Sequence, residues 1–453
     1  MTDQTSGAIS ELLDSTRPPG SFAAHGTAPA ESLVIEVEGV GVGVLGWPVT
    51  PTQARQLCDI ARPARYGLGE QTLLDPNVRD TWEVPRGRIT VDQRRWDSTL
   101  GPVLDAVRTG LGLPGDCELS AELHSMLVYE PGQFFRRHRD SEKSDGMIGT
   151  LVVTLPSDFT GGELVVEHRG EKVSDRGSPG ELGFLAFYAD CHHEVLPVTD
   201  GFRISLTYNL IASGRTAAND DLVTAPAKIA ALAGHLREHF STPIPVPTWL
   251  RDGGPASRPP NRLVYLLDHR YSQRGFGWDQ LKGSDAARAG ALVAASEHAE
   301  CDVALALAEI HRAHACDLFE DEDWMYGRRR RWELVDGTWE IVDETWEPIE
   351  DEDEDFDYEV REGVLPVDHP ERIETARLGD DFGSNAELTW WIDQSGNTGA
   401  PVEISVSDGE ICAGTAESAH QMFATESAGY MGNEGDTIDR WYRRAAIVVQ
   451  PRT

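Results

Sequence analysis

Basic residues are scarce in this sequence. Its 453 residues include 40 Lys and Arg against 76 Asp and Glu, which gives a formal net charge of −36. A surface with this excess of negative charge repels nucleic-acid phosphates and anionic lipids. We therefore expect neither nucleic acid nor a membrane among the partners of this protein. The composition leaves its oligomeric state open.

Cysteines and long apolar stretches are also few. The six cysteines lie far apart with no CxxC pair, so neither a zinc knuckle nor a disulfide framework is indicated. No run of about 18 apolar residues could span a bilayer. The N-terminus lacks the basic start and the apolar stretch of a signal peptide. These absences predict a soluble protein with reduced thiols in the cytoplasm.

The first half of the chain divides into a tail and a folded domain. Residues 1–30 are rich in Ser, Thr, Ala, Gly and Pro, and we expect a flexible tail there. A domain is predicted over 31–212, with helices near 50–61 and 98–111. Residues 121–210 then hold six short apolar runs separated by Gly, Pro and Asp. This pattern is typical of a sandwich or barrel of antiparallel strands.

The second half, 222–453, mixes helical and strand patterns. Segments rich in Ala and Leu at 222–240 and 284–315 predict helices, and strand-like runs return near the C-terminus. Between them the chain is strongly acidic, and its centre, 347–362, is expected to be a solvated loop. Together the two halves predict an α+β protein, in which a strand-rich domain with flanking helices precedes a mixed α/β region.

Three residues of the strand-rich block have the chemistry of metal ligands. His138 and Asp140 are two residues apart, so on an extended strand both side chains face the same way. With the later His193 they would form the facial triad of non-haem Fe(II) oxygenases. By itself, an HxD pair is more often an exposed surface pair. The zinc-hydrolase motif HExxH is absent.

His192 competes with His193 for the place of the second histidine. Adjacent residues on a strand face opposite sides, so only one of the two can serve. An arginine, Arg203, follows His193 by ten residues on the next predicted strand, and this interval favours His193.

Arg203 is also the expected cation for an anionic cosubstrate. Ser205 lies two residues later and repeats the facing of Arg203. A guanidinium fork and a hydroxyl can therefore reach one carboxylate. Tyr129, before the HxD pair, could add a phenolic hydrogen bond.

Five motifs follow one another in this block: Tyr129–Phe135 (YEPGQFF), His138-x-Asp140, Gly161–Leu164 (GGEL), Gly180–Phe187, and His193-xxx-Pro-Val-xx-Gly-x-Arg203. In this order and spacing they resemble the 2-oxoglutarate- and Fe(II)-dependent dioxygenases of the prolyl 4-hydroxylase type. The resemblance covers residues 121–210, about a fifth of the chain. The fold of that family is a double-stranded β-helix, or jelly roll, and the resemblance implies this fold for the strand-rich domain.

The resemblance also implies a set of site residues and cosubstrates. Carried over residue by residue, the Fe(II) ligands fall on His138, Asp140 and His193, and the cation for 2-oxoglutarate falls on Arg203, with Ser205 and Tyr129 as further contacts. The implied reaction uses 2-oxoglutarate and O2, with ascorbate as a candidate reductant. It hydroxylates a peptidyl or small-molecule substrate and releases succinate and CO2.

One departure concerns the substrate. Prolyl 4-hydroxylases usually carry Lys followed by Trp where this chain has Arg203 followed by Ile204. The 2-oxoglutarate requirement survives this change, but prolyl specificity does not follow from the resemblance.

A second interpretation makes the protein a binding module. A catalytically silent jelly roll could keep its metal residues and present the acidic C-terminal half to a protein partner. The joint presence of three ligands and a cosubstrate cation argues against this, because a silent module needs neither.

Overall fold

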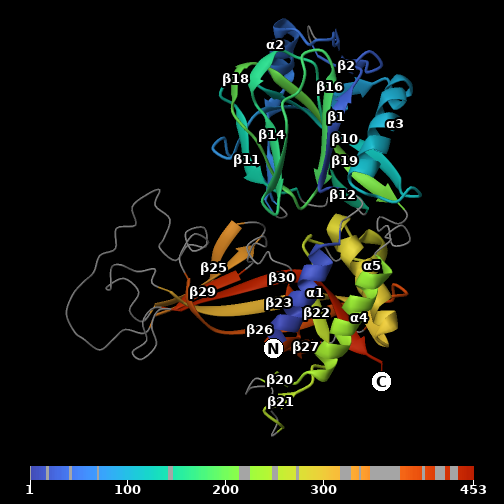
Figure 1. Ribbon diagram of the computed structural model, residues 1–453. Coiled ribbons are helices and arrows are strands. Elements are labelled where there is room, and N and C mark those ends of the chain that lie inside the picture. The colour runs from blue at the N-terminus through green and yellow to red at the C-terminus, as the bar shows by residue number, and fades with distance from the viewer. Residues whose placement is uncertain are drawn as a thin grey trace, which may run out of the picture.

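The computed structural model describes most of the chain (Figure 1). The described residues are 2–16, 20–39, 43–68, 71–140, 146–213, 225–246, 254–271, 275–316, 328–335, 338–346, 378–399, 403–413, 424–428 and 437–452. They form two units, each with its own core. We call residues 20–213 the jelly-roll unit, and the remaining described residues, including the N-terminal helix, the C-terminal unit.

Two antiparallel sheets build the jelly-roll unit. The larger sheet has the strand order β1 (Ala23–Ala28), β16 (Leu182–Tyr188), β12 (Met147–Thr154), β19 (Arg203–Ser213), β10 (Glu118–Tyr129), β8 (Trp82–Val84) and β4 (Arg62–Pro63). The smaller sheet has the order β15 (Glu171–Asp175), β14 (Leu164–His168), β17 (His192–Val195), β11 (Phe134–His138) and β7 (Arg79–Asp80).

Short strands and helices complete this unit. The small sheets are β13 (Phe159–Gly161) with β18 (Val198–Gly201), β3 (Gly43–Val44) with β2 (Ile35–Val37) and β9 (Ile89–Val91), and β5 (Tyr66–Leu68) with β6 (Gln71–Leu73). The helices are α2 (Pro51–Ile60), the 3-10 turn η1 (Arg86–Arg88) and α3 (Gln93–Gly110).

The strand order confirms the expected jelly roll. The eight strands β10, β11, β12, β14, β15, β16, β17 and β19 can be numbered 1 to 8 along the chain. They then lie in the order 6-3-8-1 in the larger sheet and 5-4-7-2 in the smaller one. A single apolar core joins the sheets, with Leu151 and Phe187 from one and Val166 and Val195 from the other. Eight strands in two facing sheets of this order make a jelly roll.

Helix α3 covers the outer face of the larger sheet. Asp92 caps its N-terminus by accepting a hydrogen bond from the backbone N–H of Arg95. The helix packs against β1 and β10, and its buried residues recur at helical spacing: Trp96, Thr99, Leu100, Val103 and Val107. Strand β12, an inner strand of this sheet, is buried at every position.

The N-terminal residues differ from the flexible tail expected over 1–30. Residues Thr2–Asp14 form helix α1, and β1 is a strand of the larger sheet, paired with β16. Ile9 and Leu13 of α1 are fully buried in the core of the C-terminal unit. They lie four residues apart, so they share one helix face. The helix is thus held by packing rather than by a strong pattern of its own.

The C-terminal unit is the expected mixed region. Its helices are α1, α4 (Pro226–Ser241) and α5 (Gly283–His298), with 3-10 turns η3 (Trp278–Gln280) and η4 (Asp408–Glu410). The main sheet has the order β25 (Thr338–Trp346), β24 (Arg328–Val335), β29 (Ala424–Ala428), β30 (Thr437–Pro451), β23 (Cys301–Cys316), β26 (Leu378–Asp393) and β27 (Ile404–Val406), and β22 (Leu263–Leu266) lies beside β30 and β28 (Ile411–Ala413). A short pair joins β20 (Ile244–Pro245) and β21 (Ser257–Arg258).

One predicted helix is only half helical. The segment 284–315 was expected to be one helix, but α5 ends at His298 and the chain continues as the long strand β23. Glu300, between them, has a positive φ of 56°, which breaks the helix. Ala and Leu suit a helix by propensity, but pairing with β30 along its whole length makes β23 a strand. The expected acidic loop 347–362 lies outside the described residues.

No helix in the described part of the chain is long and apolar enough to cross a membrane.

A buried ion network joins the two units. Arg288 of α5 donates hydrogen bonds to Asp268 and to Asp14 at the end of α1, the latter at 2.7 Å. Asp268 also pairs with Arg169 of the jelly-roll unit, at 2.5 Å. The Arg288 and Asp268 side chains are 3% and 1% exposed. Buried charges of this kind are tolerated only when each is paired.

We expect Arg288→Met to destabilise the protein by about 3–5 kcal/mol, because it removes one partner of a buried ion pair. Chemical denaturation followed by tryptophan fluorescence measures this. The matched control is Arg62→Met, since Arg62 makes an exposed pair with Glu83, and it should leave the midpoint unchanged. An Arg288→Met protein as stable as the control would show that Arg169 alone neutralises Asp268.

Candidate metal centre

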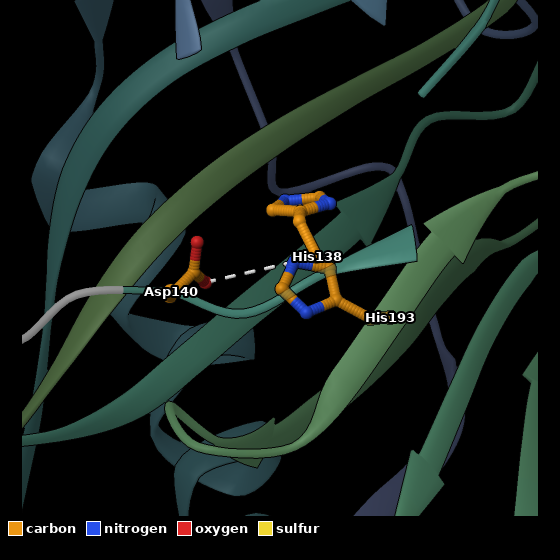
Figure 2. Close-up of side chains that lie close together, drawn as sticks. All are labelled: His138, Asp140 and His193. Atoms are coloured by element: carbon orange, nitrogen blue, oxygen red, sulfur yellow. Dashed lines mark ion pairs between the residues drawn. The ribbon is translucent and has the colours of Figure 1, made fainter. Parts of the chain in front are cut away.

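Strands β11 and β17 bring the three predicted ligands together. His138 is the last residue of β11 and lies opposite His193 of β17 in the antiparallel register. Asp140 follows β11 by two residues. One ligand atom from each of the three side chains lies within 4.8 Å of the others, and Figure 2 shows the three side chains close together. Among the three side chains, His193 Nε2 and Asp140 Oδ2 lie 3.8 Å apart.

Both imidazoles are held by the same kind of contact. The Nδ1 atom of His138 lies 2.8 Å from the carbonyl oxygen of Arg136, and the Nδ1 atom of His193 lies 3.2 Å from that of Cys191. A carbonyl only accepts, so each Nδ1 carries the proton and each Nε2 keeps a free lone pair. A neutral imidazole whose other nitrogen is bound to a carbonyl is the usual form of a metal-ligating histidine.

Asp140 is fixed from both ends. Its backbone N–H donates to the carbonyl of Ala189 at 3.1 Å, and Thr150 Oγ1 of β12 donates to its Oδ2 at 2.5 Å. Sequence reasoning missed Thr150. The signal available was a threonine inside the otherwise apolar run of β12, where a buried hydroxyl requires a partner.

The surroundings keep His138 neutral. Burial lowers its pKa well below the usual value, and the neighbouring His193 lowers it further. The Phe135 ring stacks on His138 with centroids 3.5 Å apart, and Phe187 lies 4.6 Å from His193. Two imidazoles with free Nε2 atoms and one carboxylate are a donor set that fits a divalent iron ion.

His192 lies outside this cluster. It precedes His193 on β17, and the burial pattern of the strand alternates, with His193 buried and His192 half-buried. Burial and the nearby Arg139 lower the pKa of His192 to about 3. The alternation agrees with the opposite facing expected of adjacent strand residues.

A second polar cluster surrounds Arg203 in the larger sheet. Arg203 is 1% exposed. Its Nη1 donates to Ser205 Oγ at 3.2 Å and its Nη2 to Thr154 Oγ1 at 3.3 Å. Tyr129 pairs with Arg203 across β10 and β19, and its ring centroid lies 5.5 Å from the guanidinium carbon. The structure thus brings together the three residues predicted to bind the cosubstrate.

Arg203 is suited to receive an anion. In the described part of the chain its hydrogen-bond partners are hydroxyls, and its Nε has none. Thr154 links it onward to Asp175 of β15, at 2.9 Å. Burial lowers the pKa of Arg203, yet a guanidinium remains charged in proteins. A buried cation that faces mainly hydroxyls gains most from a carboxylate ligand.

Strand β12 connects the two clusters. Thr150 contacts Asp140, and Thr154, four residues on, contacts Arg203. Four residues of strand span roughly 13 Å. The metal ligands and the buried cation therefore lie along one strand of the jelly roll, at a separation that a short dicarboxylate and a metal ion can bridge.

Comparison with known proteins agrees with this arrangement. Residues 124–211 match the model of the 2OG-Fe(II) oxygenase superfamily. The matched range contains the three candidate ligands and the Arg203 cluster. A PKHD-type hydroxylase of Picosynechococcus sp. is 34% identical over 88 residues, which are 18% of this chain and 39% of that protein. This chain thus spans about two fifths of that relative.

Solved structures of oxygenases also align with the chain. A prolyl-4-hydroxylase of Pseudomonas putida aligns over 45% of this chain and 98% of its own length, at 19% identity and a TM-score of 0.28. A prolyl hydroxylase of Trichoplax adhaerens, in complex with a hypoxia inducible factor peptide fragment, aligns over 46% and 90%, at 14% identity and a TM-score of 0.27.

We expect His193→Ala to weaken Fe(II) binding by more than about 100-fold, because loss of a ligand costs more than loss of a group that supports one. His192→Ala is the matched control and should keep most of the affinity. Anaerobic titration of metal-free protein with Fe(II) measures both. If His192→Ala lost Fe(II) affinity and His193→Ala kept it, the ligand would be His192 rather than His193.

Proposed function

We propose that this protein is an Fe(II)- and 2-oxoglutarate-dependent dioxygenase that hydroxylates a peptidyl or small-molecule substrate and releases succinate and CO2. The observation that carries the proposal is the pairing of His138 with His193, each with a free Nε2, beside Asp140. The match of residues 124–211 to the oxygenase superfamily supports it.

In this proposal the triad holds the iron. His138, His193 and Asp140 would hold the ion, and a triad of this kind leaves room for cosubstrates. When bound, Fe(II) supplies the redox chemistry that couples decarboxylation of 2-oxoglutarate to oxygen insertion into a C–H bond. Thr150 keeps the carboxylate of Asp140 oriented, and the backbone carbonyls of Arg136 and Cys191 set the imidazole tautomers.

Arg203 holds the far carboxylate of 2-oxoglutarate. Its planar fork can donate two parallel hydrogen bonds to one carboxylate, and Ser205 adds a hydroxyl to the same place. Tyr129, 1% exposed, closes this end of the site to water. In a dry site the charge pair is stronger than it would be at the surface.

The substrate is proposed only by class. The Picosynechococcus relative is a hydroxylase, which favours hydroxylation over other outcomes. The Arg203-Ile204 pair stands where prolyl 4-hydroxylases usually carry Lys and Trp, so we do not assign a prolyl substrate. Ascorbate as reductant, a cytoplasmic location and the lack of nucleic-acid partners stay predictions.

The purified protein should convert 2-oxoglutarate to succinate when Fe(II) and O2 are supplied, and Asp140→Ala should abolish this conversion because the iron loses its carboxylate ligand. Succinate measured by mass spectrometry, with and without a panel of peptides and metabolites, tests both points. Iron binding without any succinate from wild-type protein would favour the silent binding module instead.

We further expect Arg203→Lys to raise the KM for 2-oxoglutarate roughly tenfold or more, because a lysine ammonium cannot form the bidentate pair. The Fe(II) affinity should change little, since Arg203 contacts no candidate ligand. Arg62→Lys, an exposed position of the same unit, serves as control. Collapse of iron binding with an unchanged KM would contradict the role given to Arg203.

A further inference from the structure

The turn between β16 and β17 contacts two of the three candidate ligands. It consists of Ala189, Asp190 and Cys191. The carbonyl of Ala189 accepts the backbone N–H of Asp140 at 3.1 Å. The carbonyl of Cys191 lies 3.2 Å from Nδ1 of His193. The two carbonyls that flank Asp190 therefore help to place two ligand side chains.

Asp190 itself is held from the C-terminal unit. Its Oδ2 accepts from His269 Nδ1 at 3.0 Å and from the backbone N–H of Arg270 at 3.1 Å. Its Oδ1 lies 3.4 Å from Lys282 Nζ. The side chains of Asp190, His269 and Lys282 are 7%, 2% and 3% exposed. These partners come 79 to 92 residues later in the chain.

The charges of its partners stabilise the ionised form of Asp190. Burial alone would raise the pKa of Asp190, but His269 and Lys282 hold it well below the usual value. Burial acts to lower the pKa of His269, and Asp190 raises it above the usual value. Asp190 is therefore an ionised, buried carboxylate, and it is costly to leave without partners.

The same place could be read as a second metal site, but its geometry excludes this. Ligand atoms of His168, Asp190 and His269 also lie within 4.8 Å of one another. The rings of His168 and His269 are stacked at 4.5 Å with only 12° between their planes. Imidazole lone pairs lie in the ring plane, so two rings stacked face to face direct their lone pairs along separate parallel planes and cannot both bind one ion. The rings of His138 and His193, inclined at 53°, can direct theirs to one point.

We propose that the C-terminal unit positions the metal centre through Asp190, which anchors the 189–191 turn. Asp190 is a positioning residue: it touches neither metal nor substrate, and acts through the carbonyls on either side of it. The proposal rests on the proposed function, because it needs a metal at His138, Asp140 and His193. It gives the C-terminal unit a role inside the site of the jelly-roll unit.

The first test is Asp190→Asn, which keeps the shape and removes the charge. Anaerobic Fe(II) titration of the metal-free full-length protein should show affinity about 10–100-fold weaker, the loss typical of groups that support metal ligands. The visible absorption of bound Co(II) should change as well, because it reports ligand geometry. Unchanged affinity and an unchanged spectrum would overturn the proposal. Failure of wild-type protein to bind iron would instead overturn the proposed function.

A second pair of variants leaves the jelly-roll unit untouched. His269→Ala removes the donor to Asp190 and should weaken Fe(II) binding, whereas His269→Asn offers an amide N–H near the place of Nδ1 and should restore most of the affinity. This pair decides the matter if Asp190→Asn fails to fold. Equal affinities of the His269→Ala and wild-type proteins would contradict the proposal.

The control is Arg169→Gln. It breaks another ion pair between the units, which joins Asp268 to Arg169 in the turn between β14 and β15. We expect its Fe(II) affinity to stay close to that of wild type. If Arg169→Gln weakened iron binding as much as Asp190→Asn, general docking of the units would account for the effect, and the specific role of Asp190 would be wrong.

Discussion

The antiparallel pairing of β11 with β17 is the constraint on which the metal centre depends. It sets His138 opposite His193, and opposed residues of such a pair have Cβ atoms only about 5 Å apart. Asp140 leaves the end of β11 and is tied by its backbone to Ala189, just before β17. One strand pair and the turn that leads into it thus place the backbones of all three residues, and Thr150 of β12 orients the Asp140 carboxylate.

The interior of the jelly roll adds a second requirement, that every buried polar group finds a partner. Thr150 and Thr154 on β12 meet it in a way that serves the site. One hydroxyl donates to Asp140, and the other accepts from Arg203 and donates to Asp175. The same bonds that satisfy these groups also orient a ligand carboxylate and a buried cation.

At the junction of the two units the same requirement applies to buried charges, which also need partners. Asp190 and Asp268 are both buried. Asp190 is paired with residues of the C-terminal unit, and Asp268 is paired with one arginine from each unit. Moving such charges out of water is expensive, so the arrangement stands only while all partners are present.

The sequence by itself determined the candidate residues of the site and the type of fold. His138-x-Asp140 could be interpreted because two-residue spacing sets facing on a strand, and the family resemblance implied the jelly roll that the strand order confirms. The tertiary structure decided what depends on distant partners. β23 has helical composition and becomes a strand only against β30. Helix α1 packs against core residues that come more than 200 positions later in the sequence. No local sequence pattern predicted the contacts of Asp190 with His269 and Lys282, because contacts between residues distant in sequence form only when the chain has folded.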